Sequence, residues 1–310
     1  MTFVATSTLG ELRGADFTDI ARLDRGQLEA ILDLAGRIKA GDWRQRPLTG
    51  RAIALIFQKP SIRTRVSFDV GITRLGGHAI TLQDAEIGLG RRESVEDVAR
   101  VLERYVDGVV ARLFSHRELL ALAAACDIPV INALTDASHP CQVLADLLTM
   151  REVLGRLDES TPVAFVGDGN NVVSSLMEAA TVMGFPLTVI SPPAYRPSEQ
   201  SLARAHGVTV TGDLQALAGA AVVYTDVWTS MGQESEAEAR RRQFAEYRVD
   251  GQLMSLAPDA FFMHCLPAHR GEEVAAEVID GPSSVVFDQA ANRLYAQMAL
   301  LANIFAPETG

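Results

Sequence analysis

Apolar positions along the chain fall into short continuous runs that alternate with longer stretches of helical spacing. The run from Arg51 to Phe57 predicts a buried strand, and Phe68, Ile72 and Leu75 follow it at helical spacing. The other runs predict strands at 78–82, 106–110, 128–132, 162–166, 186–190, 208–211, 221–225, 260–264 and 284–287. Strands and helices that alternate in this order are typical of parallel, doubly wound sheets.

The stretches between these strands predict helices. Apolar spacing indicates helices over 23–34, 116–125 and 144–154, and Ser94 begins another helix as its cap. The segment 234–242 pairs acidic with basic residues four positions apart, which predicts a solvated helix face.

We expect the domain junction near 148–158, within or just after a long apolar-periodic helix, where the composition becomes polar over 155–160. A length of 310 residues is long for one core and suits two domains of about 150 residues each. We therefore expect an α/β fold with two doubly wound lobes, each a mostly parallel sheet flanked by helices. The expected domains are 1–148 and 149–310, with the C-terminal helix packed back on the first domain.

Composition argues against several classes of protein. Hydrophobic residues make up 48% of the chain, and no apolar run approaches the ~20 residues that a membrane span requires. The first residues lack the pattern of a signal peptide, so we expect a cytoplasmic protein. Cys126, Cys141 and Cys265 show no C-x-x-C spacing, which predicts neither a disulfide framework nor a cysteine zinc site. The net charge of -11 disfavours a nucleic-acid binder.

A basic segment interrupts this acidic chain directly after the first strand. Lys59 to Arg65 reads Lys-Pro-Ser-Ile-Arg-Thr-Arg, which puts Ser61, Arg63 and Thr64 in the first turn of a helix. Unpaired N–H groups, the helix dipole, hydroxyls and guanidinium groups together suit a doubly charged oxyanion such as phosphate. A capped helix start with solvated arginines is the alternative that this segment alone leaves open.

Other polar residues follow the predicted strands of the first lobe. The strand predicted at 106–110 runs into Arg112, at the sheet edge where open α/β sheets bind ligands. His139 and Gln142 lie one helical turn apart and can both donate hydrogen bonds to a carbonyl oxygen or an amide, although a His-Pro pair at a helix start is often only a cap. Arg293 is a further cation near the end of the chain.

The second lobe carries its candidate residues on loops after strands. Gly167 to Val172 follows a strand and opens a helix, but valine replaces the third glycine and no acidic residue ends the next strand, so NAD binding is not favoured. The asparagines of that loop could bind a carboxylate or an amine. Asp226 suits an ammonium group, with a structural cap as the alternative, and Cys265 is either a site residue or inert packing. With no Walker A, H-E-x-x-H or EF-hand pattern, neither a metal nor another cofactor is predicted.

In order and spacing, these segments resemble the ornithine carbamoyltransferases over essentially the whole chain. The resemblance rests on S-x-R-T-R at 61–65, H-P-x-Q at 139–142, Gly-Asp-Gly-Asn-Asn at 167–171, D-x-W-x-S-M-G at 226–232 and H-C-L-P at 264–267. The last two segments point to ornithine rather than aspartate as the acceptor.

The resemblance implies transfer of the carbamoyl group from carbamoyl phosphate to the side-chain amine of L-ornithine, in a cleft between the two lobes. It implies catalytic roles for Arg63, His139 and Cys265. The residues implied for carbamoyl phosphate are Ser61, Ile62, Arg63, Thr64, Arg112, His139, Gln142, Cys265, Leu266 and Arg293. Those implied for ornithine are Asn171, Asp226, Ser230 and Met231. The resemblance also implies a homotrimer, or a multiple of trimers, that works in arginine biosynthesis.

Two positions depart from the family pattern. Ile62 replaces a threonine that is common in the phosphate motif, and Glu86 replaces a glutamine in a loop that reaches a neighbouring subunit in relatives. A carboxylate would repel phosphate, so Glu86 is left out of the site. Alternative functions are a carbamoyltransferase for putrescine, an N-acylated ornithine or aspartate, or a non-catalytic module that binds an anion or a nucleotide.

Overall fold

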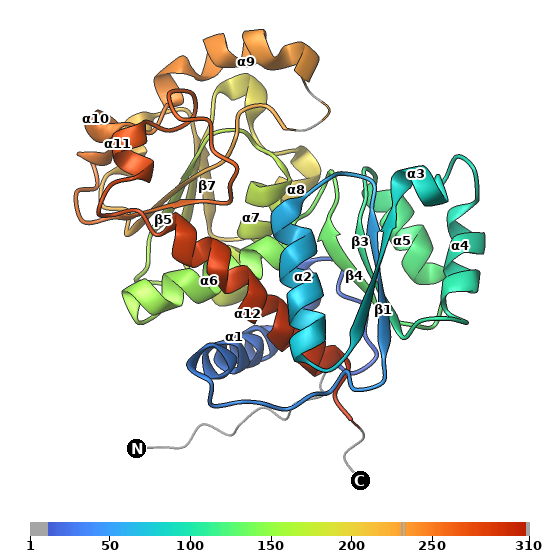
Figure 1. Cartoon of the computed structure of the whole chain (residues 1–310). Coiled ribbons are helices and arrows are strands. Elements are labelled where there is room, and N and C mark those ends of the chain that lie inside the picture. The colour runs from blue at the N-terminus through green and yellow to red at the C-terminus, as the bar shows by residue number, and fades with distance from the viewer. Residues whose placement is uncertain (1–11, 231, 233, 308–310) are drawn as a thin grey trace. The chain divides into compact units, whose positions relative to one another are not determined.

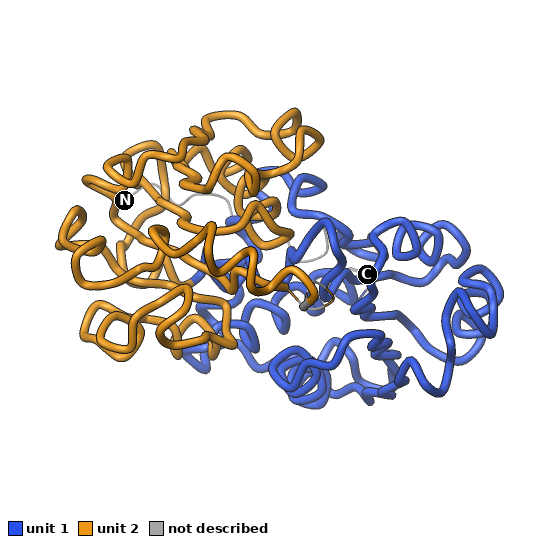
Figure 2. The backbone as a smooth tube through the Cα atoms, turned by 90° about the horizontal axis from the view of Figure 1, so that it is seen from above, with its two compact units in different colours: residues 1–148, 292–310 blue, residues 149–291 orange. Residues whose placement is uncertain are grey.

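The strands of the protein form two parallel sheets, seen in a computed structural model that describes residues 12–230, 232 and 234–307 (Figure 1). The chain divides into two units, coloured in Figure 2. Unit 1 comprises Met1–Leu148 with Asn292–Gly310, and unit 2 comprises Thr149–Ala291. Both divisions fall inside helices, α6 (Pro140–Leu154) and α12 (Val286–Ile304).

The sheet of unit 1 has four strands in the order β2-β1-β3-β4, all parallel. They are β1 (Ala52–Phe57), β2 (His78–Gln83), β3 (Gly108–Arg112) and β4 (Val130–Leu134). The chain passes from β1 to β2 on one side and then returns to place β3 on the other side of β1. In open α/β sheets ligands bind outside the carboxyl ends of the strands at such a reversal, here between β1 and β3.

The helices of unit 1 cover both faces of this sheet. They are α1 (Arg25–Ala40), α2 (Ile62–Arg74), α3 (Asp84–Ile87), α4 (Val95–Leu102) and α5 (His116–Ala124), together with the unit 1 parts of α6 and α12. Ala54, Ile56 and Val109 of the strands pack with Val98 of α4 and Leu119 of α5 in one buried cluster. Figure 1 shows α1 and α2 on the other side of the sheet. The strands are buried on both faces, which explains their continuous apolar runs.

The sheet of unit 2 has five parallel strands in the order β7-β6-β5-β8-β9. They are β5 (Val163–Val166), β6 (Leu187–Ile190), β7 (Val208–Thr211), β8 (Val222–Thr225) and β9 (Phe261–His264). Its helices are α7 (Asn171–Met183), α8 (Glu199–Ala203), α9 (Ala237–Phe244), α10 (Gly251–Met254) and α11 (Ala276–Ile279). The order reverses between β5 and β8, so this sheet also has one switch point.

Short 3-10 helices complete the described chain. They occupy Ile20–Arg22, Pro193–Tyr195, Leu214–Leu217, Glu234–Glu236 and Ala245–Tyr247. Among the described residues, none of the helices has both the length and the apolar character needed to cross a bilayer.

Local sequence signals explain where the main helices begin. Ser61, Ser94 and Ser115 precede α2, α4 and α5, and each side chain accepts a hydrogen bond from the backbone N–H three residues later. Asp24 and Gln27 form a capping box at the start of α1, which ends at Gly41 in the left-handed conformation.

The fold expected from the sequence is confirmed, with differences in the elements. The strands expected at 106–110 and 128–132 lie two residues later, at Gly108–Arg112 and Val130–Leu134. The strand expected at 284–287 is wrong, because Ser284 makes only an isolated bridge to Phe262 and α12 starts at Val286. The short apolar run Val285 to Phe287 is too brief to distinguish a strand from the first turn of a helix.

Candidate functional site

The first turn of α2 in unit 1 brings two hydroxyl groups and a guanidinium group together. The N–H of Thr64 donates to Ser61 Oγ at 3.3 Å, and Ser61 Oγ donates to Thr64 Oγ1 at 3.0 Å. Arg293, from the distant α12, donates from Nη2 to the same Thr64 Oγ1 at 2.8 Å. Thr64 and Arg293 are both buried. The structure therefore joins three predicted residues that are up to 232 positions apart in the sequence.

The pKa of His139 is affected by the positive charges around it. Burial lowers the pKa of its imidazole well below the ordinary value, and the guanidinium groups of Arg293, Arg112 and Arg63 lower that pKa further, in that order of effect. A site in which several fixed positive charges converge on a neutral histidine favours a bound anion and a hydrogen-bond donor that carries no charge. Four separate segments of the sequence contribute these groups.

The strand ends explain how unit 1 brings these residues together. The S-x-R-T-R segment follows β1, Arg112 is the last residue of β3, and His139 lies between β4 and α6. These three strands are neighbours in the sheet, so their carboxyl ends share one edge. Lys59, to which the sequence analysis gave no role, is buried, with its ammonium nitrogen 4.8 Å from the centre of the Phe114 ring.

The two departures from the family pattern have simple structural explanations. The side chain of Ile62 is 82% exposed, so it does not line the buried polar groups. Glu86 Oε2 accepts a hydrogen bond from the N–H of Gln83 at 2.7 Å and closes a capping box at the start of α3. A glutamic acid at this position therefore has a local structural role.

Replacement of Ile62 by threonine is expected to change the KM for carbamoyl phosphate by less than about threefold, because the backbone N–H and not the side chain faces the helix start. The measurement is steady-state kinetics of Ile62→Thr, with Val66→Thr, also exposed on α2, as the matched control. A tenfold or larger change for the first variant and none for the second would contradict a backbone role.

Gln142 lies in the first turn of α6 and is 1% exposed. Its side-chain Nε2 donates to Asp146 Oδ1 at 2.8 Å, while its Oε1 is buried and accepts no hydrogen bond from the described residues. This differs from the expectation that Gln142 would offer a donor. The free function of its amide is an acceptor.

In unit 2, Asp226 is the centre of a second cluster at the carboxyl ends of β5, β8 and β9. Its Oδ2 accepts from Asn170 Nδ2 at 2.7 Å, and its Oδ1 accepts from Cys265 Sγ at 2.9 Å. Asp226 is 6% exposed and Cys265 is 9% exposed. Asn170 also caps α7, since its Oδ1 accepts from the N–H groups of Val172 and Val173. Of the two asparagines, Asn170 holds the carboxylate in place.

The other residues predicted for unit 2 belong to the segments that follow β5, β8 and β9. Asn171 is the first residue of α7 and is half-buried. Ser230 lies in the segment that follows β8, and Met231 lies outside the described residues. Leu266 has a left-handed φ of 58°, rare for a branched side chain, and precedes a cis proline. Cys265 and Leu266 belong to unit 2, whereas the other residues expected for carbamoyl phosphate belong to unit 1.

A buried dyad that the sequence analysis missed supports the backbone of Leu266. The N–H of Leu266 donates to His264 Nδ1 at 2.9 Å, so the imidazole proton sits on Nε2, which lies 3.2 Å from Glu273 Oε1. His264 and Glu273 are both fully buried. Their positions nine residues apart in the sequence gave no spacing signal for this pairing.

Arg240 of α9 binds both the segment that follows Asp226 and the loop that carries Asp168. Its Nη1 lies 3.0 Å from Asp168 Oδ2 and donates to the carbonyl of Trp228 at 3.0 Å, and its Nε donates to Glu236 Oε2 at 3.1 Å. Burial raises the pKa of Asp168 to about 6, against the lowering effect of Arg240. Arg240 was assigned to a solvated helix face from its charge pattern, and this was wrong because it is 6% exposed.

Replacement of Arg240 by methionine is expected to lower the free energy of unfolding by about 3–5 kcal/mol near pH 8, since it leaves the buried Asp168 carboxylate unpaired. Without Arg240 the folded-state pKa of Asp168 rises above about 6, so the cost should diminish as the pH falls to about 5.5 and the carboxyl binds a proton. Urea unfolding at both pH values measures this.

The exposed Arg242→Met on the same helix is the control, and Asp168→Asn combined with Arg240→Met should recover much of the loss. An equal loss for the Arg240 and Arg242 variants would show that the buried ion pair contributes no more to the free energy of unfolding than an exposed one.

Two clusters in the described chain hold three potential metal ligands within 4.8 Å of one another: Asp226, His264 and Cys265, and His269, Glu272 and Glu273. In the first, Cys265 donates to Asp226 and His264 pairs with Glu273. In the second, His269 and Glu273 lie against each other. These internal contacts account for both clusters without a metal ion.

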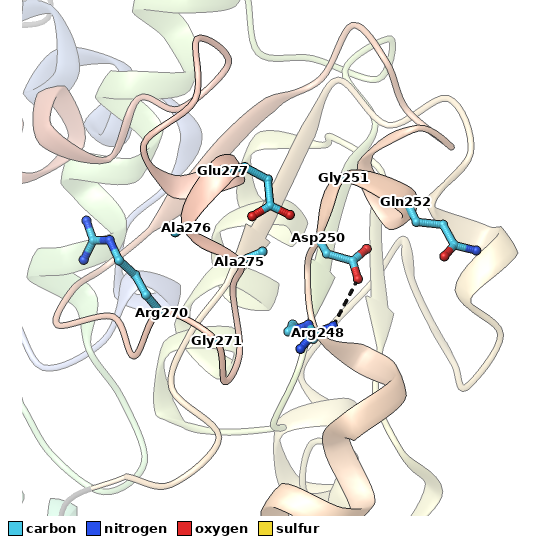
Figure 3. Close-up of a pocket in the computed structure, with 9 residues that line it drawn as sticks. All are labelled: Arg248, Asp250, Gly251, Gln252, Arg270, Gly271, Ala275, Ala276 and Glu277. Carbon is cyan, nitrogen blue, oxygen red and sulfur yellow. Dashed lines mark ion pairs between the residues drawn. The ribbon is translucent and has the colours of Figure 1, made fainter.

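A cavity of about 540 Å³ lies elsewhere in unit 2 (Figure 3). None of the predicted site residues lines it. Its charges are largely matched internally, with Arg270 on Asp280 and Arg248 on Asp250, whose Oδ1 also caps α10. This cavity is therefore not where the predicted site residues lie.

The chain matches two models of one protein family. A family model described as the carbamoyl-P binding domain of aspartate/ornithine carbamoyltransferase matches residues 15–152, and one described as the Asp/Orn binding domain matches residues 159–304. The ornithine carbamoyltransferase of Symbiobacterium thermophilum is 52% identical over 95% of this chain and 99% of its own length. That of Methanobrevibacter smithii is 52% identical over 87% of this chain and 93% of its own length.

Solved structures give the same result. The ornithine carbamoyltransferase of Pyrococcus furiosus matches with a TM-score of 0.92 and 45% identity, over 96% of this chain and 99% of its own. That of Thermus thermophilus matches with a TM-score of 0.86 and 46% identity, over 93% of this chain and 97% of its own.

Proposed function

We infer that this chain, which belongs to the aspartate/ornithine carbamoyltransferase family, transfers the carbamoyl group of carbamoyl phosphate to the side-chain amine of L-ornithine, with citrulline and phosphate as products. The family resemblance found in the sequence motifs is thereby confirmed, and the protein is a transferase. Relatives at about half identity that bear the name ornithine carbamoyltransferase support ornithine over other acceptors.

We propose that unit 1 binds carbamoyl phosphate. The observation that carries this assignment is the start of α2, where Thr64 Oγ1 accepts hydrogen bonds from Ser61 and from Arg293 Nη2. The lowered pKa of His139 agrees with it, because after burial its causes are the charges of Arg293, Arg112 and Arg63. The phosphate would accept hydrogen bonds from the start of α2, including Ser61, Thr64 and the Ile62 N–H, and from these arginines. The neutral His139 would donate to the carbamoyl oxygen, and Gln142 Oε1 would accept from the carbamoyl amino group.

We propose that unit 2 binds L-ornithine. Asp226 would hold the α-ammonium group, while Asn171, Ser230 and the Met231 backbone would hold the rest of the amino-acid end. Cys265, which donates to Asp226, and the backbone of Leu266 would face the side-chain amine and the carbamoyl group. The His264 and Glu273 pair supports this assignment, because it holds Leu266 in a costly backbone conformation.

The chemical difficulty of the reaction is the charge of the acceptor amine. Only the neutral amine attacks the carbamoyl carbon, and with a lysine-like pKa near 10.4 its deprotonation at pH 7 costs roughly 4–5 kcal/mol. The new C–N bond forms as the bond to the phosphate oxygen breaks, and the amine loses a proton. Guanidinium groups lower the pKa of a nearby amine and stabilise the departing phosphate, and positioning of the two substrates lowers the barrier further.

Citrulline formation tests this function. Carbamoyl phosphate is supplied with ornithine, putrescine, N-acetylornithine and aspartate in turn, and turnover is expected with ornithine. Putrescine lacks the α-amine that Asp226 would bind. In N-acetylornithine, acylation removes the positive charge of that α-amine. Turnover with another acceptor alone would revise the substrate, and the absence of turnover with all four would refute the enzyme.

We further propose a trimer-based homo-oligomer that works in the cytoplasm and in arginine biosynthesis. The distribution of exposed large hydrophobic residues supports an interface on unit 1, since all but Phe287 of those in the described chain lie there. They are Ile62, Val66, Ile80, Val101, Tyr105, Phe114 and Leu120. Light scattering coupled to size exclusion measures the oligomeric mass.

A further inference from the structure

The orientation of the Gln142 amide is fixed by a neighbour that has no contact role in the proposed site. Gln142 and Asp146 lie four residues apart on α6, and Gln142 Nε2 is 2.8 Å from Asp146 Oδ1. An ionised carboxylate can only accept hydrogen bonds. The contact fits this chemistry, because the amide nitrogen of Gln142 faces Asp146. The oxygen is turned to the other side.

That oxygen is buried and has no donor among the described residues. Gln142 is 1% exposed and Asp146 is fully buried, so bulk water does not satisfy the acceptor. An acceptor held in this way favours a ligand with an N–H group and disfavours one that presents a methyl group in the same place. Carbamoyl phosphate and acetyl phosphate differ in this group, an amino group against a methyl group of similar size.

We propose that Asp146 is a positioning residue that makes the site selective for the carbamoyl amino group, by holding the Gln142 oxygen toward the donor substrate. The proposal rests on the assignment of carbamoyl phosphate to unit 1. Asp146 itself would touch no substrate. It would determine which end of the Gln142 amide, the oxygen or the nitrogen, faces the substrate. An asparagine at 146 could accept from or donate to Gln142, so the amide would no longer be held in one orientation.

Equilibrium binding to the intact protein separates this selectivity from turnover. The probes are phosphonoacetamide, which carries the amino group, acetonylphosphonate, which carries a methyl group in its place, and inorganic phosphate. The unchanged protein should prefer the first over the second by about tenfold to a hundredfold. Asp146→Asn should reduce this preference by about fivefold or more while the affinity for phosphate stays within about twofold.

Three further variants sharpen the test. Gln142→Met should lose the same preference, and Asp146→Asn should then have no additional effect, because the two residues act in series. Asp146→Ser, whose hydroxyl also both donates and accepts, replaces the asparagine variant if the latter does not fold as judged by circular dichroism and its unfolding midpoint. Asp69→Asn, exposed on α2, is the control for removal of a charge.

A preference that survives in folded Asp146→Asn, or one that falls further when this change is added to Gln142→Met, would overturn the proposal. Loss of phosphate affinity in parallel with the preference would also overturn it, since it would indicate a general structural effect. An unchanged protein that binds none of the three probes would refute the assignment of carbamoyl phosphate itself, which is a distinct result.

Discussion

Arg63→Ala is expected to lower kcat/KM for carbamoyl phosphate by about 10³-fold. The side chain is half-buried beside the start of α2, and its charge is one of three that lower the pKa of His139. In the role proposed for Arg63, its loss would remove charge-assisted hydrogen bonds to the substrate phosphate and weaken stabilisation of that phosphate as it leaves. Because the second effect arises only in the transition state, kcat should fall as well as the affinity.

Steady-state kinetics with both substrates measures this, and Arg65→Ala is the matched control. Arg65 lies two residues further along the same helix but is exposed, so its loss should cost less than about threefold. The pKa of His139, followed by NMR, should rise in Arg63→Ala because one opposing positive charge is gone, and remain depressed by burial. Similar losses for the two arginine variants would contradict a specific role for Arg63.

Asp226→Asn is expected to raise the KM for ornithine by about 10²- to 10³-fold, because the buried carboxylate that we propose to pair with the α-ammonium group becomes neutral. The KM for carbamoyl phosphate should change by less than about threefold, since the groups proposed for it lie in unit 1. The amide also disturbs the cluster, because a donor replaces one of the two oxygens that accept from Asn170 and Cys265.

Thermal unfolding should therefore accompany the kinetics, with the exposed Asp259→Asn as a control in the same unit. If Asp226→Asn impaired both substrates equally at unchanged stability, the division of binding between the two units would be wrong.

The sequence predicted the parts of the site that depend on local rules. Ser61 and Ser94 fit known caps, so both helix starts could be placed. The continuous apolar run before Arg112 predicted a strand there, although two residues too early. The grouping of Arg63, Arg112, His139 and Arg293 could not be derived from spacing, because it depends on strand order. It was available only through the family resemblance.

The residues that were missed fall into two kinds. Asp146 had a usable signal, since it is four residues after Gln142 on a predicted helix, and a buried acid at that spacing orients its neighbour. Glu273 and Lys59 had none, because their partners depend on tertiary packing. Arg240 was misplaced because a salt-bridge pattern along a helix does not say whether one face is buried.

The contacts that Arg240 makes with Asp168 and the Trp228 carbonyl bear on how carbamoyltransferases could come to use different amines as acceptor substrates. Asp226 marks the end of β8, and Arg240 returns the chain to the Asp168 loop and to the carbonyl of Trp228. Trp228, in the segment between them, belongs to the apolar core and stacks on Phe244. Changes after Trp228 and before Arg240 would leave these core contacts and the contacts of Arg240 in place. Evolution can therefore exchange the recognised amine without rebuilding the scaffold that presents it.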